Sequence, residues 1–350
     1  MRLLVTGGAG FIGSALIRRA LAQGHSVLNI DKLTYAANPD SLAAIAGDER
    51  YSFLQADICD GATMAESLRA FRPDRVFNLA AETHVDRSID DPQAFIRTNI
   101  NGVHTLLDTC RTWLQEAGDE DGFRFIQIST DEVYGSIASG AFNEASPYQP
   151  NSPYSASKAS ADMLVRAWHR TYGFPAIITN CSNNYGPWQF PEKFIPTIVM
   201  KALREEAIPI YGDGQQVRDW LFVDDHADAL LRVANSGEAG ETYCVGGDAT
   251  MTNLDLARTV CDLVDDRLGR EAGASRQLIE MVADRPGHDQ RYAIDHAKIT
   301  EALGWHPACD LKEGLVRTVD WYLGQGEWLN RLAADGRAGS RLGLMQEERK

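Results

Sequence analysis

Gly7-Gly8-Ala9-Gly10-Phe11-Ile12-Gly13 is the stretch that decides the fold of this chain. It follows a short apolar segment, Arg2 to Thr6, and precedes a helical pattern from Ser14 to Gln23. Glycines at this spacing make a tight turn, let the backbone approach a pyrophosphate and allow a helix to pack closely on a strand. The segment therefore predicts a dinucleotide-binding βαβ unit; the alternative is a purely structural turn. The residues that we expect beside the cofactor are Gly7, Gly10, Phe11, Ile12 and Gly13.

An acidic residue ends the next predicted strand. Ser26 to Ile30 has the pattern of a buried strand, and Asp31 follows it. A carboxylate at this place can bind the ribose hydroxyls of the adenosine, and it repels the additional phosphate of NADP. NAD is therefore the favoured cofactor, although Lys32 keeps NADP as a minor alternative.

Tyr154 and Lys158 lie four residues apart at the start of an apolar-periodic helix that runs to about Tyr172, so they share one face. A cation beside a phenol lowers the pKa of the phenol from about 10, which predicts that Tyr154 can act as a base. The pair alone is weak evidence, because an amphipathic ring and a solvated lysine have the same spacing. The dinucleotide motif upstream favours the catalytic interpretation.

Three polar residues follow another predicted strand. Phe125 to Ser129 has the pattern of a short buried strand, and Thr130, Asp131 and Glu132 come directly after it. Ligands of open α/β sheets bind at this edge. Two solvated carboxylates are the ordinary alternative, but beside a nucleotide motif these acids are candidates for proton transfer.

The composition is typical of an enzyme from a reducing compartment. The 350 residues, 44% of them hydrophobic, suffice for a full α/β core and a smaller second lobe. The net charge of -15 leaves no basic stripe for a nucleic acid, so we expect none as a partner. Six scattered cysteines without a Cys-x-x-Cys pair predict free thiols, no disulfide and no metal. Because Met1 opens into the first strand and no apolar run is of membrane-spanning length, we expect a soluble, cytoplasmic protein.

Strand and helix patterns alternate up to about residue 180, which predicts an α/β fold with a doubly wound parallel sheet of the Rossmann type. They include one long helix from about Pro92 to Glu116 and an acidic surface turn from Gly118 to Gly122. After residue 180 the pattern becomes irregular and rich in turn residues, as in a substrate lobe built from loops.

The expected domains follow from this change of pattern. Residues 1–180 should form the NAD-binding Rossmann domain with the catalytic residues. Residues 181–330 should mainly form a smaller α/β substrate-binding lobe, with some segments returning to the first domain. Residues 331–350 show little periodicity and are expected to be a loosely packed or frayed tail.

From the first strand to about residue 322, the chain resembles the extended short-chain dehydrogenase/reductases and, within that group, the family of dTDP-glucose 4,6-dehydratases. The Asp131-Glu132 pair is the discriminating element, because related epimerases and decarboxylases expel no C6 hydroxyl and typically lack that Asp. Thr83, where many relatives carry Ser, and Ala37, in place of a frequent Gly, depart from the pattern. The segments that carry the resemblance are Asp31–Asn38, Ala81–Ser88, Ser129–Gly135, Ser182–Pro187, Pro191–Pro196 and Asp284–Asp289.

The resemblance implies a three-step reaction on dTDP-glucose. Tyr154, supported by Lys158, would take the proton of the C4 hydroxyl, which Thr130 also holds, while a hydride passes to NAD. Glu132 would then remove the C5 proton, and protonated Asp131 would donate to the departing C6 hydroxyl. Return of the hydride to C6 would give dTDP-4-keto-6-deoxyglucose. NAD would end as it began and should stay bound.

The resemblance also implies the binding residues. Besides the glycine turn, those for NAD are Asp31, Lys32, Leu33, Thr34, Asp57, Ile58, Leu79, Ala80, Ala81, Thr98, Tyr154, Lys158 and Asn184. Those for the substrate are Thr83, Thr130, Asn183, Lys193, Phe194, Pro209, Tyr211, Arg218, Asn253, Arg285 and His288. Lys193, Arg218 and Arg285 are the candidates for the phosphates, since an Arg fork suits diphosphate oxygens and an ammonium serves as a point charge.

Several alternatives stay open at this point. Asn253, with Thr252, could simply cap a helix, and we expect His226 to be structural. Another NDP-sugar 4,6-dehydratase, an NDP-sugar 4-epimerase and a catalytically idle NAD-binding scaffold are the rival functions. The preference for thymidine rests on the overall resemblance, and so does the expectation of a homodimer.

Overall fold

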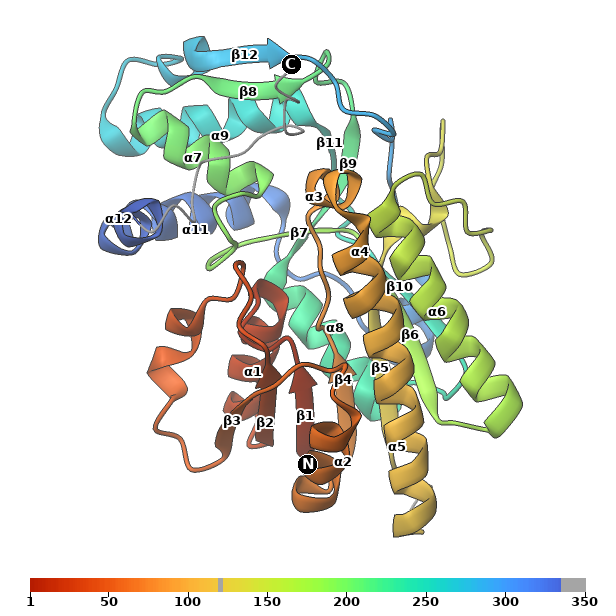
Figure 1. Cartoon of the computed structure of the whole chain (residues 1–350). Coiled ribbons are helices and arrows are strands. Elements are labelled where there is room, and N and C mark those ends of the chain that lie inside the picture. The colour runs from red at the N-terminus through yellow and green to blue at the C-terminus, as the bar shows by residue number, and fades with distance from the viewer. Residues whose placement is uncertain (119–121, 335–350) are drawn as a thin grey trace, which may run out of the picture.

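The computed structural model describes residues 1–118 and 122–334. Its centre is a sheet of seven parallel strands in the order β10-β6-β5-β4-β1-β2-β3 (Figure 1). The strand order turns back between β1 and β4, which defines a doubly wound Rossmann-type sheet and confirms the predicted fold class. The strands are β1 Arg2–Thr6, β2 Ser26–Asp31, β3 Tyr51–Gln55, β4 Arg75–Asn78, β5 Arg124–Thr130, β6 Ala176–Cys181 and β10 Thr242–Val245.

Helices cover both faces of this sheet, because its central strands are apolar on both sides. Leu3 of β1 belongs to the core on one face and Leu4 to the core on the other, as the alternation of a strand requires. The first face carries α1 (Phe11–Ala22), α8 (Val223–Ser236) and α10 (Ala297–Leu303). The second carries α2 (Gly61–Phe71), α5 (Val103–Ala117) and α6 (Pro153–Tyr172).

The long helix predicted from Pro92 to Glu116 is interrupted. The structure has α4 (Pro92–Phe95), a π-helical segment at Ile96–Gly102 and then α5. The wider turns bury Thr98 and Asn99, and a 3.6-residue period cannot reveal such a change. Of the predicted acidic turn, Gly118 ends α5 with a φ of 66°, while residues 119–121 lie outside the described part.

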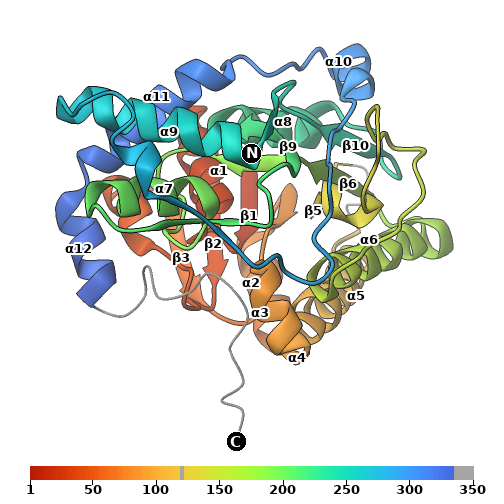
Figure 2. The same ribbon diagram turned by 90° about the horizontal axis from the view of Figure 1, so that it is seen from above.

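The smaller lobe has its own core. A three-stranded sheet contains β7 (Asn183–Tyr185), β9 (Val217–Phe222) and β11 (Thr250–Thr252), and a parallel pair joins β8 (Ile208–Tyr211) to β12 (Ile279–Val282). Its helices are α7 (Phe194–Leu203), α9 (Asn253–Leu268), α11 (Leu311–Leu323) and α12 (Gly326–Ala334). Figure 2 shows α9, α11 and α12 grouped on the side of the molecule away from α5 and α6.

The start of the predicted tail is ordered. Arg331 to Ala334 form the last turn of α12, in which Leu332 is buried against the core of the smaller lobe. Arg331 pairs with Asp40 at 2.9 Å, so this helix also contacts the Rossmann part. The expectation of a frayed tail is therefore wrong for residues 331–334, and residues 335–350 lie outside the described part.

The described residues hold no helix that is long and apolar enough to cross a bilayer. All six cysteines are free, and four of them are buried. Within residues 1–118 and 122–334, no group of three or more His, Cys, Asp or Glu side chains could hold a metal ion.

Candidate active site

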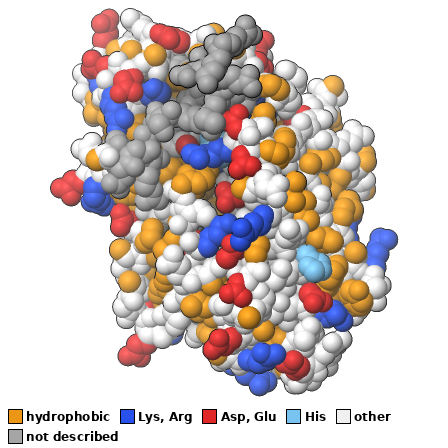
Figure 3. Space-filling model, in the orientation of Figure 1, with side chains coloured by type: hydrophobic (Ala, Val, Ile, Leu, Met, Phe, Trp, Pro, Cys, Tyr) orange, Lys and Arg blue, Asp and Glu red, His pale blue; other side chains and the backbone are white. Residues whose placement is uncertain are grey.

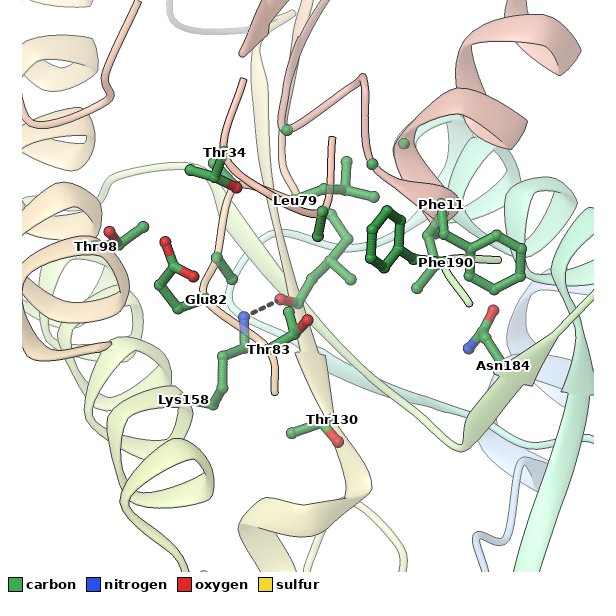
Figure 4. Close-up of a pocket in the computed structure, with 18 of the residues that line it drawn as sticks. Phe11, Thr34, Leu79, Glu82, Thr83, Thr98, Thr130, Lys158, Asn184 and Phe190 are labelled. Carbon is green, nitrogen blue, oxygen red and sulfur yellow. Dashed lines mark hydrogen bonds between the residues drawn. The ribbon is translucent and has the colours of Figure 1, made fainter. Parts of the chain in front are cut away.

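A pocket of about 300 Å³ lies where the central strands end. Segments that follow β1, β2, β4, β5 and β6 line it, as the sheet topology requires. Figure 4 shows the rings of Phe11 and Phe190 on one side and Thr98, Glu82 and Lys158 on the other. The predicted cofactor residues in its lining are Gly7, Gly10, Phe11, Ile12, Gly13, Asp31, Lys32, Thr34, Asp57, Ile58, Leu79, Ala80, Ala81, Thr98, Tyr154, Lys158 and Asn184. Leu33 does not line it.

The glycine turn fits a dinucleotide. Gly7 has a φ of +69°, and a Cβ there would lie 2.7 Å from the main-chain nitrogen of Ala80. A Cβ on Gly13 would lie 2.4 Å from the carbonyl oxygen of Gly7. Gly10 caps α1 without a side chain, and the first turn of α1 has no acid. The N–H groups at this helix end are therefore open to an anionic diphosphate.

Asp31 sits in the pocket as a constrained acceptor. Its carboxylate accepts the N–H of Ala9 at 2.9 Å and that of Leu33 at 2.8 Å, which explains why Leu33 bends to a φ of 57°. Lys32 donates to Thr98 at 3.0 Å and lies 3.6 Å from Glu82. Because an acid neutralises Lys32, the surroundings favour ribose hydroxyls over the phosphate of NADP.

Asp131 is the more buried member of the acid pair. It is 2% exposed; Oδ1 accepts from the Thr130 hydroxyl at 3.2 Å, while Oδ2 is buried without a partner among the described residues. Burial, followed by the charges of Glu132 and Asp219, raises the pKa of Asp131 well above its usual value. This environment favours a protonated carboxyl that can donate.

Glu132 lies in the opposite electrostatic environment. Burial raises its pKa, but the charges of Arg285, Arg218 and Lys193 act against that rise. Anions outweigh the one cation, Arg218, in their effect on the pKa of Asp131, whereas cations outweigh the one anion, Asp289, in their effect on the pKa of Glu132. Such a contrast separates the pKa values of neighbouring carboxyls, as an acid and a base require. These surroundings favour Asp131 as the acid and Glu132 as the base.

The predicted effect of Lys158 on Tyr154 is wrong for this structure. Burial, and after it the charge of Glu132, raises the pKa of Tyr154 well above 10, while a hydrogen bond with Thr130 lowers it less. Lys158 donates instead to the main-chain oxygen of Ile128 at 2.6 Å, drawn as the dashed line in Figure 4. Burial also lowers the pKa of Lys158 itself. Tyr154 is therefore held as a neutral phenol, which needs further positive charge before it can act as a base.

The predicted substrate residues divide into two sets. Thr83, Thr130, Asn183 and Lys193 line the pocket. Arg218 and Arg285 lie outside its lining, yet their charges, together with that of Lys193, act on Glu132 and lower its pKa against the effect of burial. The remaining residues outside the lining are Phe194, Pro209, Tyr211, Asn253 and His288.

Two local alternatives concern Asn253 and His226. The hydroxyl of Thr252 caps α9 by accepting the N–H of Asp255 at 3.1 Å, and Asn253 is the first residue of that helix. Nδ1 of the buried His226 lies 2.9 Å from the amide oxygen of Asn184. Burial lowers the pKa of His226 to about 3, so it stays neutral and holds a pocket residue in place. These contacts give His226 a structural partner, and the substrate contact of Asn253 stays a prediction.

Sequence reasoning missed several residues of the site. Glu192 lines the pocket, accepts from the Tyr35 hydroxyl at 3.0 Å and lies 3.7 Å from Arg87. The guanidinium of Arg87 stacks over the Tyr35 ring at 3.8 Å. These residues lie in segments that carry the family resemblance, but no spacing rule indicates that residues 35, 87 and 192 meet. The other unpredicted lining residues are Ile30, Ala36, Ala37, Ala56, Glu82, Ile128, Ser129, Cys181, Ser182, Gln189 and Phe190.

Comparisons with known proteins agree with this geometry. The family model of GDP-mannose 4,6 dehydratase matches residues 4–318. The chain is 52% identical over 345 residues to a dTDP-glucose 4,6-dehydratase of Shigella flexneri, covering 95% of each chain. Its fold matches the dTDP-glucose 4,6-dehydratase DesIV of Streptomyces venezuelae, solved with NAD and TYD bound, with a TM-score of 0.87, 45% identity and coverage of 95% and 100%. It also matches the UDP-glucose 4-epimerase of Thermotoga maritima, solved with UDP-glucose, with a TM-score of 0.81, 30% identity and coverage of 93% and 99%.

The fold and the site define an NAD-dependent enzyme of the Rossmann type, one that carries an acid pair beside a Tyr–Lys pair. The 4-epimerase shares that fold at lower sequence identity, so the fold alone does not distinguish a dehydratase from an epimerase. This chain belongs to the GDP-mannose 4,6 dehydratase family, and within it to the dTDP-glucose 4,6-dehydratases.

Proposed function

We propose that this protein converts dTDP-glucose into dTDP-4-keto-6-deoxyglucose and water. The observation that carries the proposal is the contrast between Asp131, a buried acid on which mainly anions act, and Glu132, a carboxyl on which mainly cations act. Elimination of water across C5 and C6 needs one group to donate a proton and another to accept one. The names of the curated relatives support the same reaction and the same nucleotide.

NAD is the cofactor that this pocket fits, and when bound it supplies a positively charged nicotinamide that accepts a hydride and later returns it. The glycine turn, the N-terminus of α1 and Asp31 would hold its diphosphate and ribose. Positive charge beside Tyr154 lowers the pKa of the buried phenol, so Tyr154 can then take the proton of the C4 hydroxyl. Thr130 holds that hydroxyl from the end of β5.

The acid pair acts on the 4-keto sugar. A ketone at C4 makes the C5 proton acidic, and Glu132 removes it. Asp131 gives its proton to the C6 hydroxyl, which leaves as water and creates the C5–C6 double bond. Charge balances over this step, since Glu132 gains the proton that Asp131 loses. With the hydride returned to C6 and a proton from Glu132 to C5, the product forms and no external reductant is consumed. Tyr154 then loses the proton that it took from the C4 hydroxyl, and Asp131 regains one from solvent, so the protons balance.

The direct test gives purified protein dTDP-glucose without added reductant, with UDP-glucose and GDP-mannose as controls. We expect a product lighter by one water, with the alkaline absorbance of a 4-keto sugar, from dTDP-glucose alone. Equal turnover of another nucleotide sugar would show that the protein does not select the thymine nucleobase. An unchanged mass with inverted C4 would indicate a 4-epimerase, the activity of the Thermotoga maritima neighbour. An unchanged substrate would indicate an NAD-binding scaffold.

We also propose that the protein is a cytoplasmic homodimer in which residues 1–180 form the cofactor domain and residues 181–330 mainly the substrate lobe. Free cysteines support the reducing compartment. Exposed apolar side chains on the helical face of the Rossmann part support a second copy as partner: Ile96 is 45% exposed, Met163 49% and Tyr172 53%. Figure 3 shows hydrophobic side chains gathered on the side of α4 to α6.

A further inference from the structure

A buried carboxylate joins the Rossmann part of the molecule to the smaller lobe at α3 (Val85–Asp90). Asp86 is 2% exposed and accepts from the Tyr211 hydroxyl at 2.8 Å and from Nη1 of Arg285 at 3.1 Å. Tyr211 ends β8 and Arg285 follows β12, so Asp86 is bonded at the end of the parallel pair that these strands form. Figure 1 shows α3 at the boundary between the two parts of the molecule.

Arg285 donates a hydrogen bond to Asp86 and still has an N–H group that no described residue accepts. Nη1 is committed to Asp86, while Nε is buried and has no hydrogen-bond partner among the described residues. A buried guanidinium N–H without an acceptor is unfavourable, so the geometry favours an oxygen-rich ligand. The charge of Arg285 also acts on Glu132, so the guanidinium is electrostatically coupled to the catalytic acids.

Asp86 stays ionised in this position. Burial alone raises its pKa, but the hydrogen bond from Tyr211 and the charge of Arg285 outweigh burial and lower the pKa. An ionised carboxylate with one oxygen on each partner fixes the guanidinium and the phenol relative to each other. The same short segment places the base, since Oγ of Ser88 accepts the main-chain N–H of Tyr154 at 3.1 Å.

We propose that Asp86 is a positioning residue of the substrate site, which orients Arg285 so that it binds the diphosphate of the nucleotide sugar. The inference rests on the proposed function, because it assigns the anion that Arg285 meets to the substrate. Asp86 itself repels a phosphate, so it acts through Arg285, while the Tyr211 hydroxyl donates its one hydrogen to Asp86 and holds that carboxylate in place. Its loss should weaken binding of the diphosphate much more than binding of the nucleoside or the chemistry at C4 to C6.

The test uses Asp86→Asn in the NAD-loaded full chain, with dTDP and thymidine as ligands in titration calorimetry. Loss of a charge-assisted hydrogen bond predicts a Kd for dTDP raised by about 10- to 100-fold. The Kd for thymidine and the NAD content should stay unchanged, and KM for dTDP-glucose should rise while kcat falls much less. Asp90→Asn, which removes the same charge from an exposed position of α3, is the matched control and should bind dTDP normally.

A double-mutant cycle separates positioning from a general role in folding. If Asp86 acts through Arg285, adding Asp86→Asn to Arg285→Lys should weaken dTDP binding by less than about threefold further. If Asp86→Asn yields no folded protein, Asp86→Glu takes its place, with the same selective loss of dTDP expected. Normal dTDP binding, an equal loss of thymidine or full additivity with Arg285→Lys would overturn the inference. Failure of the wild-type protein to bind dTDP or to convert dTDP-glucose would instead contradict the proposed function.

Discussion

Asp131 and Glu132 are neighbours in the chain, yet their surroundings are opposite. Thr130 ends β5 and its hydroxyl accepts the N–H of Glu132 at 3.3 Å, which starts a single 3-10 turn. The charge of Asp219 raises the pKa of Asp131, while the charges of three cations act against the rise in the pKa of Glu132. At this scale the catalytic difference between two ordinary acids comes from the elements that surround them.

Asp131→Asn tests the acid role. An amide of the same shape cannot donate a proton with the acidity of a carboxyl, so kcat should fall by about 10²- to 10⁴-fold. Oxidation at C4 does not use Asp131, so the absorbance of reduced nicotinamide should accumulate when the variant meets dTDP-glucose. Rapid mixing with absorbance detection measures both effects. Retained full turnover in this variant would contradict the assignment.

The pH profile of kcat tests both acids. Glu132 acts deprotonated, and its pKa is raised, so activity should fall as the pH drops through that pKa. Asp131 acts protonated, and its pKa is raised further, so activity should fall as the pH climbs through it. Asp219→Asn removes one of the charges that raise the pKa of Asp131, and it should move the alkaline limb to lower pH. An alkaline limb that stays in place would show that another group titrates there.

At the scale of the element, the glycine turn brings β1 and the start of α1 into close backbone contact, which shapes the dinucleotide site. The backbone of Gly7 and the start of α1 approach each other so closely that only a hydrogen fits on Gly13. That contact leaves the uncapped end of α1 facing the pocket.

Gly13→Ala should therefore lose NAD. The added methyl would lie 2.4 Å from the Gly7 carbonyl oxygen, and relieving that overlap should cost about 1–3 kcal/mol of the free energy of unfolding. Gly47→Ala is the control, since a methyl there meets nothing within 4 Å. Thermal unfolding and the NAD content of purified protein measure the effect. An NAD content equal to that of the Gly47 variant would contradict this account of the turn.

The sequence predicts what local patterns encode. Periodicity and the glycine spacing predict the parallel sheet, and the order of motifs places Asp31, Thr130 and Tyr154 at one edge of it. The π-helical segment at 96–102 escaped prediction, because its period differs from that of the helix that it interrupts. The pKa of Tyr154 departs from the predicted direction chiefly because the phenol is buried, and next because of the charge of Glu132, neither of which a helix-face argument can reveal.

At the scale of the whole molecule, the active site lies between two parts with separate cores. The Rossmann part supplies the acids, the tyrosine and the glycine turn, while Lys193, Arg218 and Arg285 come from the chain beyond residue 180. α12 packs in the second core and contacts Asn38 of the first part through Trp328 at 3.3 Å. Contacts of this kind fix the cations relative to the acids, and they depend on residues far apart in the sequence.

Met163→Asp tests the proposed dimer. Met163 is 49% exposed on α6, and a charge at a desolvated apolar interface is unfavourable, so the variant should dissociate. Met281→Asp places the same charge on β12, where Met281 is 51% exposed, and should leave the dimer intact. Light scattering after size exclusion gives the mass of each species. Dissociation of both variants, or of neither, would move the interface away from α6.

The most direct test of the central claim follows one hydrogen. dTDP-glucose carrying deuterium at C4 should give dTDP-4-keto-6-deoxyglucose with the deuterium on C6, one water lost and no reductant consumed. Mass spectrometry and NMR locate the label. Deuterium returned to C4 in a sugar that keeps its C6 hydroxyl, or a substrate left unchanged, would contradict the account.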